Sequence, residues 1–336
     1  CSMNFAATLL QWFKNNGRSL PWRETNDAYA IWLSEVILQQ TRIVQGMSYW
    51  ERFMAQWPTV NDLAAATENE VLKAWQGLGY YSRARNLHTA AQQVMELGGF
   101  PQTFKDLKTL KGVGDYTAAA IASIAFGEPV AVVDGNVYRV LSRYYGIDTP
   151  IDSTEGKKGF QALAQSLLPI NEPADYNEAI MDFGATQCTP NSPHCSACPL
   201  CKTCVAFREQ RINELPVKNK KVKQRERHFT YLYIEYEGKI AIHQRGAGDI
   251  WQGLWEFPQE ECLTSSEDSA WKTEAQLLQK GVKHILTHQI LLADIYLWQP
   301  TRRPQLPSEF IWIEKQDLEN YALPRLIEIL LKAVPA

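Results

Sequence analysis

The sequence lacks both a long apolar run and an excess of basic residues. No stretch reaches the roughly 18 apolar residues that a membrane span needs, which argues against a membrane-spanning protein. With 34 Lys and Arg against 37 Asp and Glu, the 336-residue chain has a formal net charge of −3. A DNA-binding domain often has a pI above roughly 9, whereas this sequence has a pI near 6.1. Any contact with nucleic acid must therefore be confined to local patches.

The N-terminal residues also lack the basic, apolar and small-residue segments of a secretory signal peptide. Instead, apolar residues recur there at helical spacing, at Phe5, Leu9, Leu10, Trp12 and Phe13. We therefore expect a cytoplasmic protein without a membrane partner.

Cysteine is scarce outside one short segment. Five of the seven cysteines lie between Cys188 and Cys204, while Cys1 and Cys262 are isolated. A disulfide framework spreads its cysteines along the chain, so this distribution favours a metal or cluster in a reducing compartment.

Four of these cysteines have the spacing Cys-x6-Cys-x2-Cys-x5-Cys, at Cys188, Cys195, Cys198 and Cys204. Structural zinc usually lies between two separated Cys-x2-Cys pairs, whereas a compact run is typical of a [4Fe-4S] cluster. The spacing favours the cluster. Cys201 leaves the ligand set open, because residues 195, 198, 201 and 204 also form a run of Cys-x2-Cys units.

The chain is about twice the usual length of one domain, and its patterns divide it in two. In the first part apolar residues return every three or four positions, as in helices. The segments with this pattern are 28–40, 68–75, 82–97, 117–126 and 178–186. We predict an all-α domain over residues 1–213, with its cysteine loop at 188–204, followed by a basic linker over 214–227.

The second part, residues 228–336, is predicted to be an α+β domain. Residues 229–234 and 240–242 alternate around a turn at 237–239, which suits a β-hairpin. Further strands are expected at 290–298 and 310–313, and helices at 269–279 and 323–332.

Residues 110–117, LKGVGDYT, have the form of a helix-hairpin-helix turn. Gly112 and Gly114 leave backbone N–H groups open to an anion, and the following helix start adds its positive dipole end. A DNA phosphate is the natural ligand. A lone Gly-x-Gly could equally be an ordinary helix connection, but here it precedes a cysteine cluster in a helical domain.

Two carboxylates stand out by their surroundings. Asp134 in VDGNVYR lies where a helix should begin, and by itself it would be read as an N-cap. Glu35 in LSEVILQQT interrupts an otherwise apolar run. A carboxylate in such a place must be paired, protonated through desolvation, or functional.

The order of these motifs resembles the adenine DNA glycosylases, the MutY family, within the helix-hairpin-helix superfamily that also contains endonuclease III. The motifs are PWR, LSEVILQQT, GLGYYSRARNLH, LKGVGDYTAAAIAS, VDGNVYR, NEAIMDFGA and the cysteine run. The resemblance covers nearly the whole chain. It implies a helix-hairpin-helix glycosylase domain with a [4Fe-4S] cluster loop, plus an α+β Nudix-like C-terminal domain.

The resemblance also implies a mechanism. Glu35 would be the general acid that protonates adenine N7, and Asp134 would face the oxocarbenium-like sugar. Tyr116, Asn136 and Glu178 match positions that order these two carboxyls or the attacking water. Bifunctional relatives carry a Schiff-base lysine where this chain has Tyr116, so we expect a monofunctional glycosylase.

The expected partner is double-stranded DNA with adenine opposite 8-oxoguanine or guanine, bound by a monomer. In a bacterial cell the protein would then be cytoplasmic and associated with the nucleoid through DNA. By resemblance, residues near the lesion are Arg23, Leu38, Gln40, Thr41, Tyr80, Thr287 and His288, and hairpin glycines Gly112 and Gly114 bind phosphate. The C-terminal domain offers only Glu274 where Nudix hydrolases have several acids, which indicates a lesion sensor. Leu286-Thr287-His288 stands where family members often carry Phe-Ser-His.

Three alternatives remain. The nearest is an endonuclease III-type glycosylase that excises oxidised pyrimidines, which Tyr116 and the second domain disfavour. A non-catalytic DNA-binding or redox-sensing protein would bind DNA without base release, and a Nudix hydrolase of oxidised nucleotides would depend on magnesium.

Overall fold

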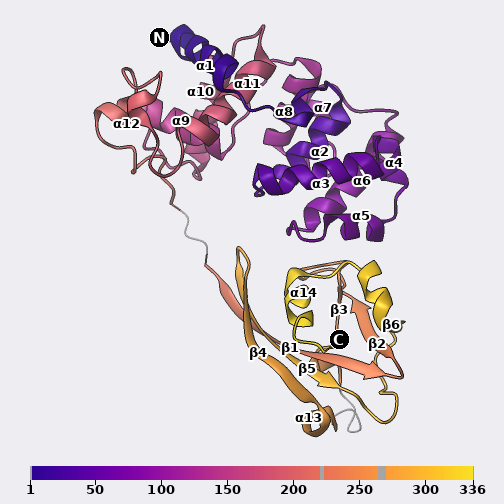
Figure 1. The fold of residues 1–336 in the computed structure, drawn as a ribbon. Coiled ribbons are helices and arrows are strands. Elements are labelled where there is room, and N and C mark those ends of the chain that lie inside the picture. The colour runs from indigo at the N-terminus through magenta and orange to yellow at the C-terminus, as the bar shows by residue number, and fades with distance from the viewer. Residues whose placement is uncertain (1, 220–222, 264–269, 336) are drawn as a thin grey trace. The chain divides into compact units, whose positions relative to one another are not determined.

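The computed structural model describes residues 2–219, 223–263 and 270–335 (Figure 1). Its contacts divide the chain into a first unit, Cys1–Asp62 with Thr89–Lys220, and a second unit, Leu63–His88 with Lys221–Ala336. The segment 63–88, expected in the helical domain, thus groups with the C-terminal part. Over the residues described, no helix is long and apolar enough to cross a membrane.

The chain is predominantly helical as far as residue 208. All five segments that were predicted to be helices from their periodicity are confirmed. The α-helices are α1 (Ser2–Asn16), α2 (Ala28–Leu38), α3 (Ile43–Gln56), α4 (Val60–Ala65), α5 (Glu68–Trp75), α6 (Ser82–Glu96), α7 (Phe104–Leu107), α8 (Asp115–Phe126), α9 (Gly135–Tyr145), α10 (Thr154–Leu167), α11 (Pro173–Asp182) and α12 (Val205–Arg208). Short turns are η1 (Pro21–Arg23), the π-helical η2 (Phe183–Gln187) and η3 (Cys195–Ala197).

Helix α2 is the buried element that carries Glu35. Nine of its eleven residues are buried, and Glu35 is its one charged residue. The Asp27 carboxylate caps the helix by accepting a hydrogen bond from Tyr29 N at 3.1 Å. The helix packs against α8, whose Ala-rich sequence keeps side chains small and allows close approach. This packing brings the middle of α2 to the start of α8.

The predicted hairpin is present between α7 and α8. Gly112 has a φ of 73°, in the left-handed region that favours glycine. Gly114 is the N-cap of α8, and a Cβ there would meet nothing within 4 Å, so its backbone is open. The turn therefore presents unobstructed backbone just before a helix N-terminus.

The C-terminal part is built on a six-stranded mixed sheet. The strands are β1 (Arg225–Tyr236), β2 (Lys239–Gln244), β3 (Trp255–Glu256), β4 (Gln276–Ile285), β5 (Gln289–Trp298) and β6 (Phe310–Glu314). Their order is β3-β2-β1-β5-β4, with β6 also paired to β2. β1 runs parallel to β5, while the β1–β2 hairpin is antiparallel with Glu235 opposite Ile240. This confirms the predicted hairpin and the strands at 290–298 and 310–313.

The side chains of β1 alternate between the two faces of the sheet, and each face packs in a separate core cluster. Phe229, Tyr231 and Tyr233 belong to one core cluster together with the buried residues of α14 (Arg325–Leu331). Leu232 and Ile234 belong to the opposite cluster, which also contains Trp271 of α13 (Trp271–Glu274). Helix α14 confirms the helix predicted at 323–332, and 3₁₀ turns η4 (Glu260–Cys262) and η6 (Lys315–Asn320) complete the unit.

Two local predictions were wrong. The helix predicted at 269–279 is reduced to the single turn α13, because β4 begins at Gln276 and pairs with β5; residue 269 lies outside the described residues. The basic stretch 214–227 is not all linker, since strand β1 already begins at Arg225. Residues 220–222 of that stretch are likewise outside the described residues.

Candidate active site and cysteine loop

Four of the five predicted catalytic residues line one cavity of about 610 Å³ in the first unit. They are Glu35 from α2, Tyr116 from the first turn of α8, and Asp134 and Asn136 from the start of α9. The volume falls within the roughly 300–1,000 Å³ typical of small-molecule pockets. The cavity is therefore large enough to receive one nucleobase.

Burial raises the pKa of Glu35 to about 7. A hydrogen bond from Tyr116 and the charge of Arg23 oppose this shift, while the neighbouring negative charge of Asp134 adds to it. Glu35 thus holds a proton that it can give up near neutral pH, which is the property a general acid needs.

Asp134 has different surroundings. Its carboxylate caps α9, where Oδ1 accepts from Val137 N at 2.8 Å and Oδ2 accepts from the Asn136 side chain at 2.9 Å. Burial raises the pKa of Asp134 above its usual value, and these hydrogen bonds together with the charge of Arg139 oppose the rise. The donors favour the ionised form of Asp134.

Tyr116 connects the two sides of the cavity. Its hydroxyl lies 3.4 Å from the Met181 sulfur and is also hydrogen-bonded to Glu35. Burial and the adjacent carboxylates hold the pKa of Tyr116 well above its usual value, so the phenol stays neutral. It can orient the acid but cannot supply an amine nucleophile.

An ion-pair cluster that the sequence did not reveal lies beside this cavity, and two of its members, Arg18 and Arg23, line it. Asp182, fully buried, accepts hydrogen bonds from Arg18 at 2.5 and 2.9 Å and from Arg23 at 2.8 and 2.9 Å. Arg23 also lies 3.5 Å from Glu178, whose pKa burial raises to about 7. Arg23, predicted near the lesion, therefore points at two acids of α11. In the sequence, Asp182 could be noticed only as the second of the two acids in NEAIMDFGA.

Three further predicted DNA-binding residues, which are close together in the sequence, also line this cavity. Leu38 ends α2, and Gln40 and Thr41 form the turn after it. Gln40 is exposed and has a φ of 56°. A left-handed conformation costs a residue other than glycine roughly 1–2 kcal/mol, and such strain tends to gather at functional sites.

The remaining lesion candidates meet in the second unit. Tyr80, Thr287 and His288 line a cavity of about 830 Å³, and the Tyr80 and Thr287 hydroxyls are hydrogen-bonded to each other. Tyr80 also has a left-handed backbone, with a φ of 50°. The fold thus brings Tyr80 together with Thr287 and His288, which are distant in the sequence. The remaining predicted DNA-binding residues, Gly112 and Gly114, belong to the hairpin turn of the first unit.

The five clustered cysteines line a single small cavity beside α9. The loop ends are fixed by Arg143, which is 2% exposed and donates to the carbonyls of Thr189, Pro190, Ile212 and Leu215. Its Nη1 also lies 3.5 Å from Cys188 Sγ. Among the described residues, no group of three or more Cys, His, Asp or Glu is placed to hold a single metal ion.

Helix α9 links this cysteine loop to the catalytic cavity. Arg139 donates to the Cys188 carbonyl at 2.8 Å and to the Asn136 side-chain oxygen at 2.8 Å. The Asn136 amide then donates to Asp134. Gly184 of η2 packs against Asn136, where a Cβ would come within 2.6 Å of the Asn136 Cβ. A continuous series of hydrogen bonds thus joins the cysteine loop to Asp134.

Comparison with known proteins agrees with this architecture. Residues 33–166 match the model of the HhH-GPD superfamily of base excision DNA repair proteins, and residues 230–333 match the NUDIX domain. The fold is similar to a thermostable thymine-DNA glycosylase, with a TM-score of 0.58 and 31% identity over 62% of this chain and 97% of that one. Endonuclease III trapped on DNA shares the fold, with a TM-score of 0.55 and 22% identity over 62% of this chain and 98% of its own.

These two domains define a DNA glycosylase of the helix-hairpin-helix superfamily with a fused Nudix domain. The chain is 38% identical to the adenine DNA glycosylase of Mus musculus over 95% of this chain and 75% of the relative. It is 30% identical to that of Buchnera aphidicola subsp. Acyrthosiphon pisum over 98% of this chain and 97% of the relative. The chain belongs to the adenine DNA glycosylase family.

Proposed function

We propose that this enzyme hydrolyses the N-glycosidic bond of adenine mispaired with 8-oxoguanine or guanine in duplex DNA. The observation that carries the proposal is the pair of carboxyl groups in one cavity, Glu35 with its pKa raised to about 7 and Asp134 held by hydrogen-bond donors. Two carboxyls with different environments can divide acid and electrostatic work between them.

In the proposed reaction Glu35 donates its proton to adenine N7. The bond between C1′ and the base then breaks, the electron pair leaves with the neutral base, and the sugar develops positive charge. Ionised Asp134 stabilises that charge, and water adds at C1′ and loses a proton to solvent to give the abasic site. Tyr116, Asn136 and Glu178 act as positioning residues, Tyr116 and Asn136 through their contacts with Glu35 and Asp134.

The proposed DNA contacts follow from the same geometry. The open backbone at Gly114 and the left-handed turn at Gly112 suit a phosphate. The exposed, left-handed Gln40 suits insertion beside an extruded base. Tyr80, Thr287 and His288 share the second cavity, and we assign recognition of the oxidised guanine to them. The proposed assembly on DNA is a monomer.

We further propose a [4Fe-4S] cluster in the cysteine loop, held by Cys188, Cys195, Cys198 and Cys204. The residues fit this group, because all four line one cavity although, within the described chain, they are not placed to share one ion. The cluster would supply structural rigidity to the loop that Arg139 and Arg143 contact.

The rate of base release should fall as pH rises through about 7, because only protonated Glu35 can act as the acid. Well above that pH, the single-turnover rate constant should drop about tenfold for each pH unit. The measurement is excision at saturating enzyme between pH 6 and 9. Glu178 titrates in the same range, so Glu178→Gln is the matched control. It should keep an inflection, moved to lower pH because the charge of Glu178 contributes to the raised pKa of Glu35. A flat profile would contradict the assignment of the acid.

The lesion assignment is tested with duplexes that differ only in the base opposite adenine. Single-turnover excision should be faster opposite 8-oxoguanine than opposite guanine, and a Thr287→Val variant should lose part of that difference because its hydroxyl is gone. Equal rates on both duplexes in the unmodified protein would overturn lesion recognition, even if adenine is released.

A further inference from the structure

The turn between β4 and β5 carries two of the proposed lesion contacts. Thr287 and His288 are exposed at its tip, and the turn is closed by a hydrogen bond from Leu286 N to the Gln289 carbonyl at 2.8 Å. Exposed polar side chains can recognise one added oxygen on a base only if their backbone is held still. The attachment of this turn to the rest of the unit therefore matters for recognition.

The start of β1 and the residue before it, Gln224, hold the turn at three points. Arg225 N donates to the His288 carbonyl at 2.9 Å, and the Gln224 side chain donates to the Leu286 carbonyl at 3.0 Å. The third contact joins Arg227 Nη1 to the Gln289 side-chain oxygen at 3.2 Å. The third contact continues through side chains toward the interior of the unit, beside the main-chain pairing of β1 with β5.

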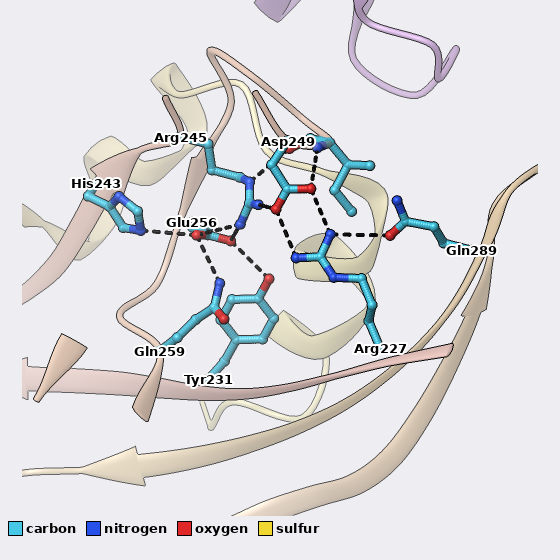
Figure 2. A network of polar contacts seen from close by, with 9 residues as sticks. Arg227, Tyr231, His243, Arg245, Asp249, Glu256, Gln259 and Gln289 are labelled. Carbon is cyan, nitrogen blue, oxygen red and sulfur yellow. Dashed lines mark hydrogen bonds and ion pairs between the residues drawn. The ribbon is translucent and has the colours of Figure 1, made fainter. Parts of the chain in front are cut away.

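A chain of alternating charges connects Arg227 to the core (Figure 2). The Arg227 guanidinium donates to both oxygens of Asp249 at 2.6 and 2.8 Å. Asp249 also accepts from Arg245 Nη2 at 2.8 Å. Arg245 Nη1 in turn lies 2.8 Å from each oxygen of Glu256. The charges of two carboxylates and two guanidinium groups therefore alternate along this series of contacts and compensate one another.

The inner end of this chain is a fixed anchor. The Glu256 side chain is 1% exposed, and its oxygens accept further hydrogen bonds from Tyr231 at 2.9 Å and Gln259 at 3.1 Å, with His243 at 3.0 Å. A buried charge with this many partners is costly to displace. The Glu256 side chain is therefore held in place. It also fixes the positions of the side chains that are hydrogen-bonded to it.

The outer end is more accessible, since the side chains of Arg227 and Asp249 are 23% and 39% exposed. Arg227 also lies over the Phe229 ring, 4.9 Å from its centroid. Hydrogen bonding to Arg227 holds the pKa of Asp249 at about 2, so the pair remains charged at neutral pH. Removing Arg227 would leave the buried pair of Arg245 and Glu256 intact.

We propose that Arg227 is a positioning residue for lesion recognition, which transmits the rigidity of the buried Glu256 anchor to the β4–β5 turn through Gln289. The inference rests on the proposed function, because it assigns Arg227 to the discrimination between 8-oxoguanine and guanine. Its planar fork is needed, since one guanidinium serves Asp249 and Gln289 together.

The first test measures the turn itself in the full-length protein. Hydrogen–deuterium exchange at residues 286–289 should become several-fold faster in Arg227→Gln and in Gln289→Ala, with other strands of the sheet unchanged. Arg225→Gln is the matched control, since it removes the same charge from the same strand at an exposed side chain and leaves its backbone bond to His288 in place. Unchanged exchange in both test variants would overturn the proposal.

The second test measures discrimination by single-turnover excision of adenine opposite 8-oxoguanine and opposite guanine. In Arg227→Gln and Gln289→Ala the ratio of the two rates should fall about fivefold or more, with the rate opposite guanine unchanged. Arg225→Gln should keep the ratio. Equal loss in Arg225→Gln would indicate a general charge effect and contradict the proposal. If the unmodified protein has no preference, the proposed lesion recognition fails, while hydrogen exchange still decides whether Arg227 fixes the turn.

Discussion

Replacing Glu35 by glutamine is expected to abolish adenine release. Glutamine has the same shape, so the packing of α2 should be preserved, but its amide cannot deliver a proton to the base. General acid catalysis contributes about 10²–10⁴-fold, and single-turnover excision should fall by that factor. The affinity for lesion-containing duplex should change little, because Glu35 is placed to protonate the base and not to hold the backbone.

A nearby exposed carboxylate provides the control for Glu35. Glu24 follows the turn η1 and is exposed, so Glu24→Gln removes one negative charge without touching the cavity. That variant should excise adenine at the normal rate. Full activity in Glu35→Gln, with binding intact, would rule out Glu35 as the acid.

Replacing Asp134 by asparagine should produce the other large loss. Asparagine is as good an N-cap as aspartate, so its oxygen can keep the Val137 N–H bond and α9 should remain folded. The negative charge opposite the developing sugar cation is lost. Electrostatic stabilisers of this kind are worth about 10²–10³-fold in rate, which single-turnover excision would detect.

The Asp134→Asn variant has a second readout that a simple folding defect would not produce. The charge of Asp134 raises the pKa of Glu35, so its removal should lower that pKa and move the inflection of the residual rate to lower pH. Thermal unfolding should be nearly unchanged. Excision at the normal rate, or an inflection that moves to higher pH, would contradict the pairing of these two carboxyls.

The sequence predicted this site as far as local patterns reach. Glu35 was identifiable because an acid inside an apolar helix is costly, and Asp134 because a helix start needs a cap. Asp182 was not, since its two arginine partners are more than 150 residues away and no local pattern records such pairing. Contacts between distant segments are visible only in the folded chain.

The second unit shows the same limit. Its first hairpin was predictable from alternation and from the turn at Glu237 and Gly238, which both have positive φ. Strand β4 was not, because pairing with β5 overrides its local preference and its register is interrupted by irregularities. The alternating charges from Arg227 to Glu256 come from separate elements, so no single motif contains them.

The proposed adenine glycosylase activity is tested by identifying the base released in a single turnover from a duplex with adenine opposite 8-oxoguanine. A duplex with thymine glycol opposite adenine is the control, and each reaction is divided between alkali treatment and none. We predict free adenine from the first duplex only, with strand cleavage appearing only after alkali, because Tyr116 offers no amine. Release of thymine glycol, or cleavage without alkali, would contradict it and would place the chain with the endonuclease III-type enzymes.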